Sequence, residues 1–251
     1  MKTTDNTILI TGGATGIGRG LAEAFYARGN RVILAGRRRE ALDAVVTANP
    51  GMHAYVLDVA DADAVRAFAQ RVTVEHPTLN VLINNAGIMR AERLLAQADH
   101  LADAEAMAIT NLLGPIRLTA ALLPALQKQP RSTIVNVTSG LAFVPLAITP
   151  TYSATKAALH SYTQSLRAQL AGTTTEVIEL APPAVQTDLM PGQATAAHAM
   201  PLKAYIDEVM HLFEAHPEAE EVCVERVKWL RNAEAEGRFA EVSQTLNGRP
   251  R

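Results

Sequence analysis

Ser139, Tyr152 and Lys156 are residue types that can act together on a carbonyl group, and they lie within one short stretch of the chain. Tyr152 and Lys156 are four residues apart, so on a helix their side chains share one face, one turn apart. An ammonium near a phenol favours the phenolate and lowers the tyrosine pKa from about 10. A tyrosine adjusted in this way can exchange a proton near neutral pH.

The serine follows an apolar run, residues 133–138, which predicts a buried strand. Its hydroxyl would then lie at the carboxyl edge of a sheet, where open α/β folds bind ligands. A Tyr-x-x-x-Lys pair alone is a weak signal, because roughly one such chain in ten contains it by chance, and an isolated pair is more often a solvated helix face. The interpretation therefore depends on a second, independent motif.

That second motif is a glycine-rich turn near the N-terminus. Residues 7–11 form a short apolar run typical of a strand, and apolar residues at helical spacing follow the glycines. Glycines let the backbone approach a pyrophosphate, and a helix N-terminus supplies amide donors and a positive dipole. In this context the turn predicts nucleotide binding, although the glycine pattern alone would also fit an ordinary turn. The candidate residues are Gly12, Thr15, Gly16, Ile17 and Gly18.

The next predicted strand, residues 31–35, ends in Gly36 and is followed by Arg37, Arg38 and Arg39. NAD-binding folds often carry an acid near this strand end for the ribose hydroxyls, whereas a nearby arginine accommodates a 2′-phosphate. The arginines could also be a solvated helix start, although basic residues are disfavoured beside the positive end of a helix dipole. The sequence therefore favours NADP(H) and leaves NAD(H) possible, with Arg37 or Arg38 as the phosphate partner.

Strands and helices alternate along most of the chain. Further strands are expected at 53–57, 79–83, 133–138 and 176–180, and helices at about 40–48, 60–75, 99–127 and 151–171. This alternation predicts an α/β protein of the Rossmann type, with a doubly wound, mostly parallel sheet and helices on both faces. The residues at the ends of the third and fourth strands are Asp58 and Val59, and then Asn84, Asn85, Ala86 and Gly87.

The predicted helix 99–127 contains Asn111 and Pro115. Proline has no backbone N–H, so the carbonyl of Asn111 would lose its helical partner, and a kink is expected there. A free carbonyl beside an asparagine amide suits an ordered water. The alternative is a kink that serves packing alone.

The remainder of the chain is expected to be helical. A connection over 188–200 is followed by predicted helices at about 202–215 and 218–236 and by a polar tail. We expect one domain over residues 1–251, with 188–215 as a lid on the substrate side and 218–251 as a helical C-terminal extension. The apolar residues of 189–210 could equally belong to the core.

Composition excludes several classes of function. The chain has 251 residues and a net charge of −2, which gives no basic field for nucleic acid or an anionic membrane. Cys223 is the only cysteine, which fits a reducing compartment, and we expect a cytoplasmic location. The N-terminal residues lack the apolar stretch of a signal peptide, and we expect no bilayer-spanning run. The histidines show no metal-binding spacing, so no metal is expected.

Taken together, these motifs resemble the short-chain dehydrogenase/reductase family, in order and approximate spacing, over about residues 7–187. The resemblance implies that Tyr152 is the general acid, that Lys156 lowers its pKa and binds the nicotinamide ribose, and that Ser139 holds the substrate oxygen. It further implies that Asn111 anchors a water relay. The residues that it assigns to the cofactor are Asp58 by the adenine, Asn85 near the adenine ribose, and Pro182, Val185 and Thr187 at the nicotinamide amide.

The chain also departs from the usual family pattern. Pro183 stands where the family often has glycine, and no C-terminal strand ending in Asp-Gly-Gly is found, since residues 239–246 lack such a motif. The runs 139–145 and 181–185 resemble the DltE-type branch, which implies little about the substrate.

The resemblance implies an NADP(H)-dependent oxidoreductase that acts on a small-molecule alcohol or carbonyl substrate. The alternative is a catalytically idle NADP(H)-binding sensor or scaffold on the same fold. In this family two long helices, here about 99–127 and 151–171, commonly pair across a two-fold axis, so we expect a homodimer. The expected contact face on the second helix comprises Ala158, Tyr162, Ser165, Leu166 and Gln169.

Overall fold

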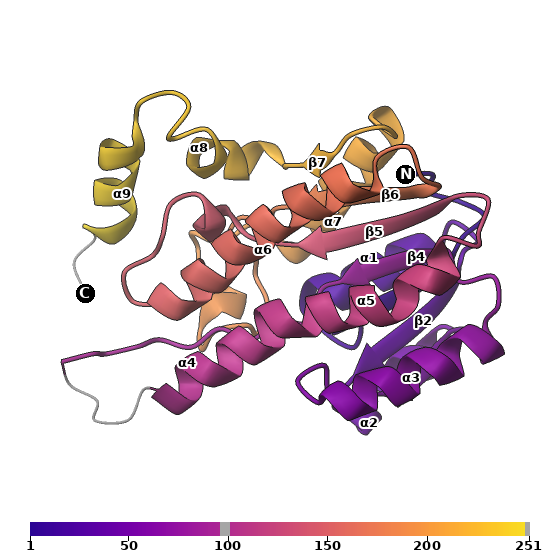
Figure 1. Cartoon of the computed structure of the whole chain (residues 1–251). Coiled ribbons are helices and arrows are strands. Elements are labelled where there is room, and N and C mark those ends of the chain that lie inside the picture. The colour runs from indigo at the N-terminus through magenta and orange to yellow at the C-terminus, as the bar shows by residue number, and fades with distance from the viewer. Residues whose placement is uncertain (96–100, 249–251) are drawn as a thin grey trace.

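A computed structural model describes residues 1–95 and 101–248, so the expected helix start at Asp99 lies outside the described residues. Within those residues, seven parallel strands form one sheet in the order β3-β2-β1-β4-β5-β6-β7 (Figure 1). The strands are β1 (Thr7–Thr11), β2 (Arg31–Gly36), β3 (His53–Val56), β4 (Val81–Asn84), β5 (Ser132–Val137), β6 (Thr175–Leu180) and β7 (Glu221–Val222).

The central strands are apolar because both faces of the sheet are covered. Every residue of β1, β4 and β5 is buried, as expected for a parallel sheet between two layers of helices. Leu9 of β1 pairs with Ile33 of β2 on one side and with Leu82 of β4 on the other. The strand order therefore reverses between β1 and β4, and a ligand cleft is expected at their carboxyl ends.

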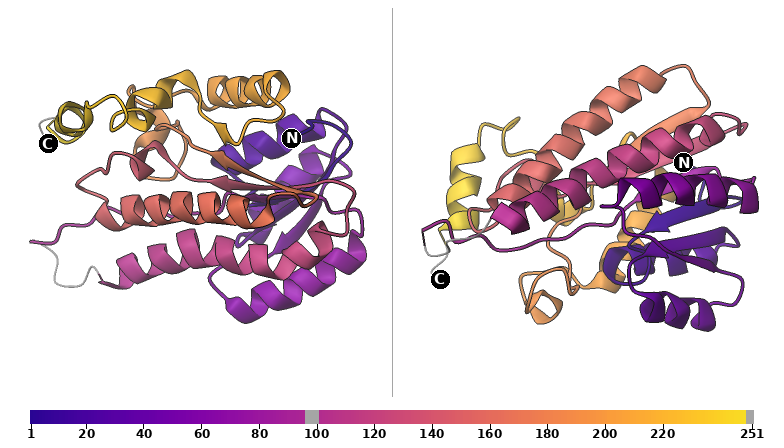
Figure 2. Two further views of the ribbon diagram at one scale, coloured as in Figure 1. Left: turned by 45° about the horizontal axis from the view of Figure 1, so that its top comes forward. Right: turned by 60° about the horizontal axis from the view of Figure 1, so that its bottom comes forward.

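Helices cover both faces of the sheet (Figure 2). The helices α1 (Gly16–Tyr26), α2 (Arg39–Ala48) and α7 (Leu202–Ala215) enclose one core with Phe25, Tyr205 and Phe213. On the opposite face, α3 (Ala62–Glu75), α5 (Gly114–Leu126) and α6 (Pro150–Leu170) enclose a second core with Phe68, Leu118 and Leu166. The predicted doubly wound α/β architecture is therefore confirmed.

The long helix predicted around Asn111 consists of three segments. The helix α4 (Leu101–Ala108) passes through a π-helical turn, η1 (Ile109–Leu113), into α5. The N–H of Gly114 bonds to the carbonyl of Ile109, five residues earlier, so Pro115 falls in the first turn of α5, where no N–H is needed. The widened turn therefore accommodates the proline that we expected to produce a kink.

Among the described residues, the helical stretch Leu101–Leu126 is long and apolar enough to cross a membrane by length and composition, with a mean hydropathy of 1.4. The expectation that no run would meet this criterion was wrong. In this fold Leu118, Leu122 and Leu126 are buried in the core between α3, α6 and the sheet. The buried leucines of the stretch therefore serve the packing of the core.

The predicted helix 218–236 was wrong. Its first part is the strand β7, in which Glu221 pairs with Glu179 and Val222 with Leu180 of β6. A 3-10 turn and the short helix α8 (Lys228–Arg231) follow, and α9 (Phe239–Asn247) occupies the expected polar tail. Residues 239–247 form α9, in agreement with the expected absence there of a strand ending in Asp-Gly-Gly, whereas β7 extends the sheet edge at Glu221 and Val222 without that motif.

Candidate functional site

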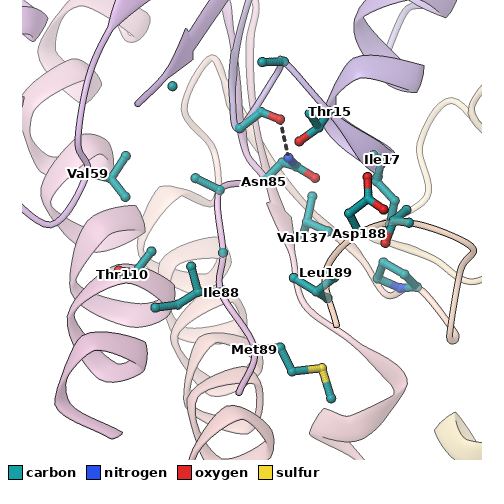
Figure 3. Close-up of a pocket in the computed structure, with 18 of the residues that line it drawn as sticks. Thr15, Ile17, Val59, Asn85, Ile88, Met89, Thr110, Val137, Asp188 and Leu189 are labelled. Carbon is teal, nitrogen blue, oxygen red and sulfur yellow. Dashed lines mark hydrogen bonds between the residues drawn. The ribbon is translucent and has the colours of Figure 1, made fainter. Parts of the chain in front are cut away.

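A cleft with a volume of about 480 Å³ lies at the carboxyl ends of the strands (Figure 3). It is lined by loops that follow β1, β2, β3, β4, β5 and β6 and by the first turns of α6. The cleft brings together Gly12, Thr15, Gly16, Ile17, Arg37, Arg38, Asp58, Val59, Asn85, Ala86, Gly87, Ser139, Tyr152, Lys156, Pro182, Val185 and Thr187. Of the predicted site residues, Gly18 and Asn111 do not line it.

The glycine turn after β1 has the conformation that its sequence requires. Gly12 and Gly16 have φ angles of +66° and +53°, a left-handed region that favours glycine. A Cβ on Gly18 would lie 2.3 Å from the carbonyl oxygen of Gly12, so this glycine permits close packing of α1 against the turn. The turn thus presents the N-terminus of α1 to the cleft, as anion binding requires.

The amide of Asn85 holds this turn in place. Its Nδ2 donates to the carbonyl oxygens of Thr11 at 2.9 Å and Gly12 at 3.4 Å, and Figure 3 shows the second bond. The backbone N–H groups of Asn85 and Ala86 both donate to Oγ1 of Thr11, each at 3.1 Å. Asn85 therefore connects the loop after β4 to the glycine turn.

The region after β2 carries the two predicted arginines. Arg37 and Arg38 are exposed, and Nη2 of Arg38 donates to Oγ1 of Thr15 at 3.3 Å. Neither arginine forms an ion pair within residues 1–95 and 101–248. Asp58 accepts a hydrogen bond from the N–H of Ala60 at 2.9 Å. This end of the cleft therefore offers two uncompensated cations.

At the opposite end, α6 places Tyr152 and Lys156 on one face, with exposed fractions of 6% and 4%. Nζ of Lys156 donates to the carbonyl oxygen of Val137 at 2.8 Å and lies 5.6 Å from the centre of the Tyr152 ring. Ser139 follows β5, and its Oγ accepts a hydrogen bond from the N–H of Leu141 at 3.1 Å. The three predicted residues thus meet in one buried corner.

Burial shifts the pKa values of two residues in this corner. Burial raises the pKa of Tyr152 to about 12, and a hydrogen bond with Ser139 acts in the opposite direction. Burial also lowers the pKa of Lys156 to about 8. In this arrangement one N–H of the ammonium is directed at the end of β5, and the expected lowering of the Tyr152 pKa by Lys156 stays a prediction. With this raised pKa, the phenol of Tyr152 keeps its proton at pH 7.

Asn111 is fully buried in the π-helical turn. Its Oδ1 accepts from the N–H of Ile88 at 2.9 Å, and its Nδ2 donates to the carbonyl oxygen of Ile88 at 2.8 Å and to Oγ1 of Thr155 at 3.3 Å. These bonds hold the side chain against the loop after β4 and the helix α6, and the water expected at the backbone carbonyl of Asn111 stays a prediction. Asn111 thus supports the site from behind its lining.

Only the first part of the predicted lid borders the cleft. Asp188, Leu189 and Gln193 line it, whereas α7 packs beneath the sheet and buries Tyr205 and Phe213. The lid assignment was therefore wrong for α7, which is a core helix.

Gln193 is the most informative residue that the sequence analysis missed. Its Nε2 donates to the carbonyl oxygen of Val185 at 2.7 Å and to Oγ1 of Thr187 at 3.4 Å. Other lining residues that were not named as site residues include Ala14, Leu57, Ile88, Met89, Arg90, Thr138, Asp188 and Leu189. Their position in the connections that follow the strands was the available signal, since the carboxyl ends of parallel strands border the same cleft.

Comparison with known proteins agrees with this architecture. The sequence profile of the short chain dehydrogenase family matches residues 6–197. The chain is 45% identical over 196 residues to the uncharacterized oxidoreductase DltE of Bacillus subtilis, and the matched segment covers 75% of each protein. It is 35% identical over 185 residues to a sulfoacetaldehyde reductase of Chromohalobacter salexigens, covering 72% of this chain and 73% of that protein.

Among solved structures, a short chain dehydrogenase from Burkholderia cenocepacia in complex with NADP superimposes with a TM-score of 0.82. It is 27% identical in sequence, and the match covers 98% of this chain and 99% of the other. The family profile, the sequence relatives and this fold agree with the motifs assembled in the cleft. The chain belongs to the short-chain dehydrogenase/reductase family of oxidoreductases and is of the DltE type.

Proposed function

We propose that the protein is an NADP(H)-dependent oxidoreductase that interconverts an alcohol and a carbonyl compound, with Tyr152 as the general acid and base. The observation that carries the proposal is the shared cleft. One end holds the buried corner of Ser139, Tyr152 and Lys156, and the other holds the glycine turn and the exposed arginines. A hydride carrier that spans the cleft would reach both ends.

Two local features fit such a dinucleotide. The left-handed glycines expose the N-terminus of α1, which suits a pyrophosphate. Gln193 shows that Val185 and Thr187 can bind a primary carboxamide, the same group that nicotinamide carries. The carboxamide of the cofactor would replace that of Gln193 at these acceptors.

The phosphate form of the cofactor is favoured by charge. No acidic side chain stands at the end of β2, where Gly36 is followed by the exposed Arg37 and Arg38. A guanidinium binds a 2′-phosphate with paired, charge-assisted hydrogen bonds. The structural relative from Burkholderia cenocepacia, which was solved in complex with NADP, supports the same choice.

The residues of the corner divide the chemistry between them. When bound, NADP(H) would supply or accept the hydride. Ser139 would hold the substrate oxygen, and Tyr152, whose pKa of about 12 keeps it neutral, would donate a proton to that oxygen. The ammonium of Lys156 would stabilise the phenolate that remains. The negative charge of this phenolate develops in the transition state and persists after the proton has been transferred.

A binding experiment tests the first half of this proposal. Titration of the protein with NADPH and NADH, followed by nicotinamide fluorescence, should show saturable binding that is tighter for NADPH. An absence of binding would reject the enzyme and the sensor alike. Binding without turnover on any carbonyl compound would favour the idle sensor or scaffold.

Carbonyl reduction should slow as the pH rises through about 8. Burial lowers the pKa of Lys156 to about 8, so above this pH the residue loses the charge that stabilises the developing phenolate, while Tyr152 remains protonated. The measurement is kcat for NADPH oxidation from pH 6 to 10 at saturating substrate. A rate that stays flat to pH 10 would contradict a role for the charged ammonium.

We further propose a homodimer that buries the outer faces of α5 and α6. Leu113 is 38% exposed, and the partly exposed Ile116 and Leu123 continue an apolar stripe along the helix. On α6, Leu166 packs into the core, so its expected place in the contact was wrong, whereas Tyr162 remains half-buried at the surface. Self-association through one repeated patch would give two-fold symmetry.

Analytical ultracentrifugation at micromolar concentration should therefore give a dimer, and Ile116→Glu should give a monomer because it would bury a charge in the contact. The control Val74→Glu alters a residue that is 80% exposed on α3 and should remain dimeric. A monomeric wild type would reject the α5–α6 interface. A stable tetramer would show that a second surface, such as the edge at β7, also associates.

A further inference from the structure

Glu92 is a buried carboxylate that the proposed mechanism does not use. It follows β4 by a short loop and is 7% exposed. Its Oε1 accepts from the N–H of Thr151 at 2.9 Å, its Oε2 accepts from Oγ1 of Thr151 at 2.8 Å, and its own N–H donates to the carbonyl oxygen of Ile148 at 2.9 Å. Both carboxylate oxygens are thus bound to the start of α6.

The helix α6 lacks a cap of its own. Thr149 stands at the N-cap position and makes no side-chain capping bond, and Pro150 has no N–H. The N–H of Thr151 is therefore the first donor of the helix, and a carboxylate 59 residues away satisfies it. Because no cation lies within ion-pair distance of Glu92 in the described part of the chain, the positive end of the helix dipole is its electrostatic partner.

The loop that carries Glu92 is also held by hydrogen bonds at two earlier residues, Asn85 and Ile88. Asn85 binds the glycine turn, and Ile88 is held by both groups of the Asn111 amide. Residues 85–92, here called the brace, therefore join the cofactor turn, the π-helical turn and the first turn of α6. The brace reaches α6 at Thr151, immediately before Tyr152.

We propose that Glu92 is a positioning residue for Tyr152, fixing the rotation and the axial position of the first turn of α6. This inference rests on the proposed function, because the phenol must lie within hydrogen-bonding reach of the substrate oxygen held by Ser139. A displacement of about 1 Å in such a group can reduce turnover about a hundredfold. Both oxygens of Glu92 are occupied, so the carboxylate is not offered to the substrate.

The test compares Glu92→Ala with a second capping residue that lies outside the cleft. Asp61 caps α3 by accepting from the N–H groups of Asp63 at 2.9 Å and Ala64 at 3.0 Å. Asp61→Ala should lower the melting temperature, because loss of an N-cap side chain costs about 0.5–2 kcal/mol of stability, and it should leave kcat unchanged. Glu92→Ala should lower kcat at least about tenfold and leave the Kd for NADPH within about twofold.

Two milder variants separate positioning from stability. Glu92→Gln retains one acceptor oxygen and should recover part of the lost kcat, and Thr151→Val removes only the hydroxyl bond and should show an intermediate loss. Unchanged kcat in Glu92→Ala, or in both milder variants if Glu92→Ala does not fold, would overturn the proposal. Loss of NADPH binding together with kcat would also overturn it, because the brace would then serve the cofactor.

Hydrogen exchange gives a readout that does not need turnover. The amides of residues 151–155 should exchange faster in Glu92→Ala than in wild type, and those of residues 62–66 should not. If wild type shows no turnover, the proposed function fails, and this exchange alone decides whether Glu92 fixes the first turn of α6. Equal protection in wild type and Glu92→Ala would reject the positioning role.

Discussion

Replacing Tyr152 by phenylalanine should reduce turnover at least about a hundredfold and leave the Kd for NADPH nearly unchanged. The substitution removes only the hydroxyl. Because Tyr152 is 6% exposed, the ring that remains should keep its buried position. The substrate oxygen would then lose its proposed proton donor. Steady-state NADPH oxidation and fluorescence titration measure the two quantities.

A matched control is available on α1. Tyr26 donates to the carbonyl oxygen of Pro50 at 2.7 Å and does not line the cleft, so Tyr26→Phe should turn over at the wild-type rate. If Tyr152→Phe stayed within a few-fold of wild type, the phenol would not be the proton donor and the mechanism would be rejected.

Arg37→Ala should weaken NADPH binding about tenfold to a hundredfold and should change NADH binding little. A hydrogen bond to a charged group contributes about 1.5–3 kcal/mol, and NADH lacks the 2′-phosphate that would receive it. Arg37 lines the cleft and is exposed, so its guanidinium can reach a phosphate without first breaking an ion pair in the described residues. Fluorescence titration of each variant with both cofactors measures the difference.

Arg39 provides the control within the same run of arginines. It is paired with Asp43 at 2.8 Å on the exposed side of α2 and does not line the cleft, so Arg39→Ala should bind both cofactors as wild type does. Equal losses for NADPH and NADH in Arg37→Ala would show that Arg37 is only a surface charge. A selective loss in Arg38→Ala instead would assign the phosphate to Arg38.

The sequence was sufficient for the architecture because its main signals are local. Buried runs such as 7–11 and 133–138 coincide closely with β1 and β5, and the helix predicted at 202–215 coincides with α7. Parallel strands place all their carboxyl ends at one edge, so motifs that follow strands had to converge. Tyr152 and Ser139 could therefore be assigned to one site before their distance was known.

The errors came from interactions between distant segments. The two-residue strand β7 exists because Val222 can pair with Leu180, and the charged residues around it gave a helical pattern instead. The spacing of Tyr152 and Lys156 fixed a shared helix face, but the direction of the long lysine side chain depends on the carbonyl of Val137. The contact between Glu92 and Thr151 joins residues 59 apart and has no signal within either segment.

The most direct test of the account is NADPH oxidation by the wild-type protein against a panel of aldehydes and ketones, with Tyr152→Phe measured in parallel. The account predicts that at least one carbonyl compound is reduced, with one alcohol formed for each NADPH consumed, and that Tyr152→Phe loses this activity. Saturable NADPH binding without oxidation on any compound, and without NADP⁺ reduction by the matching alcohols, would contradict it and identify a sensor or scaffold.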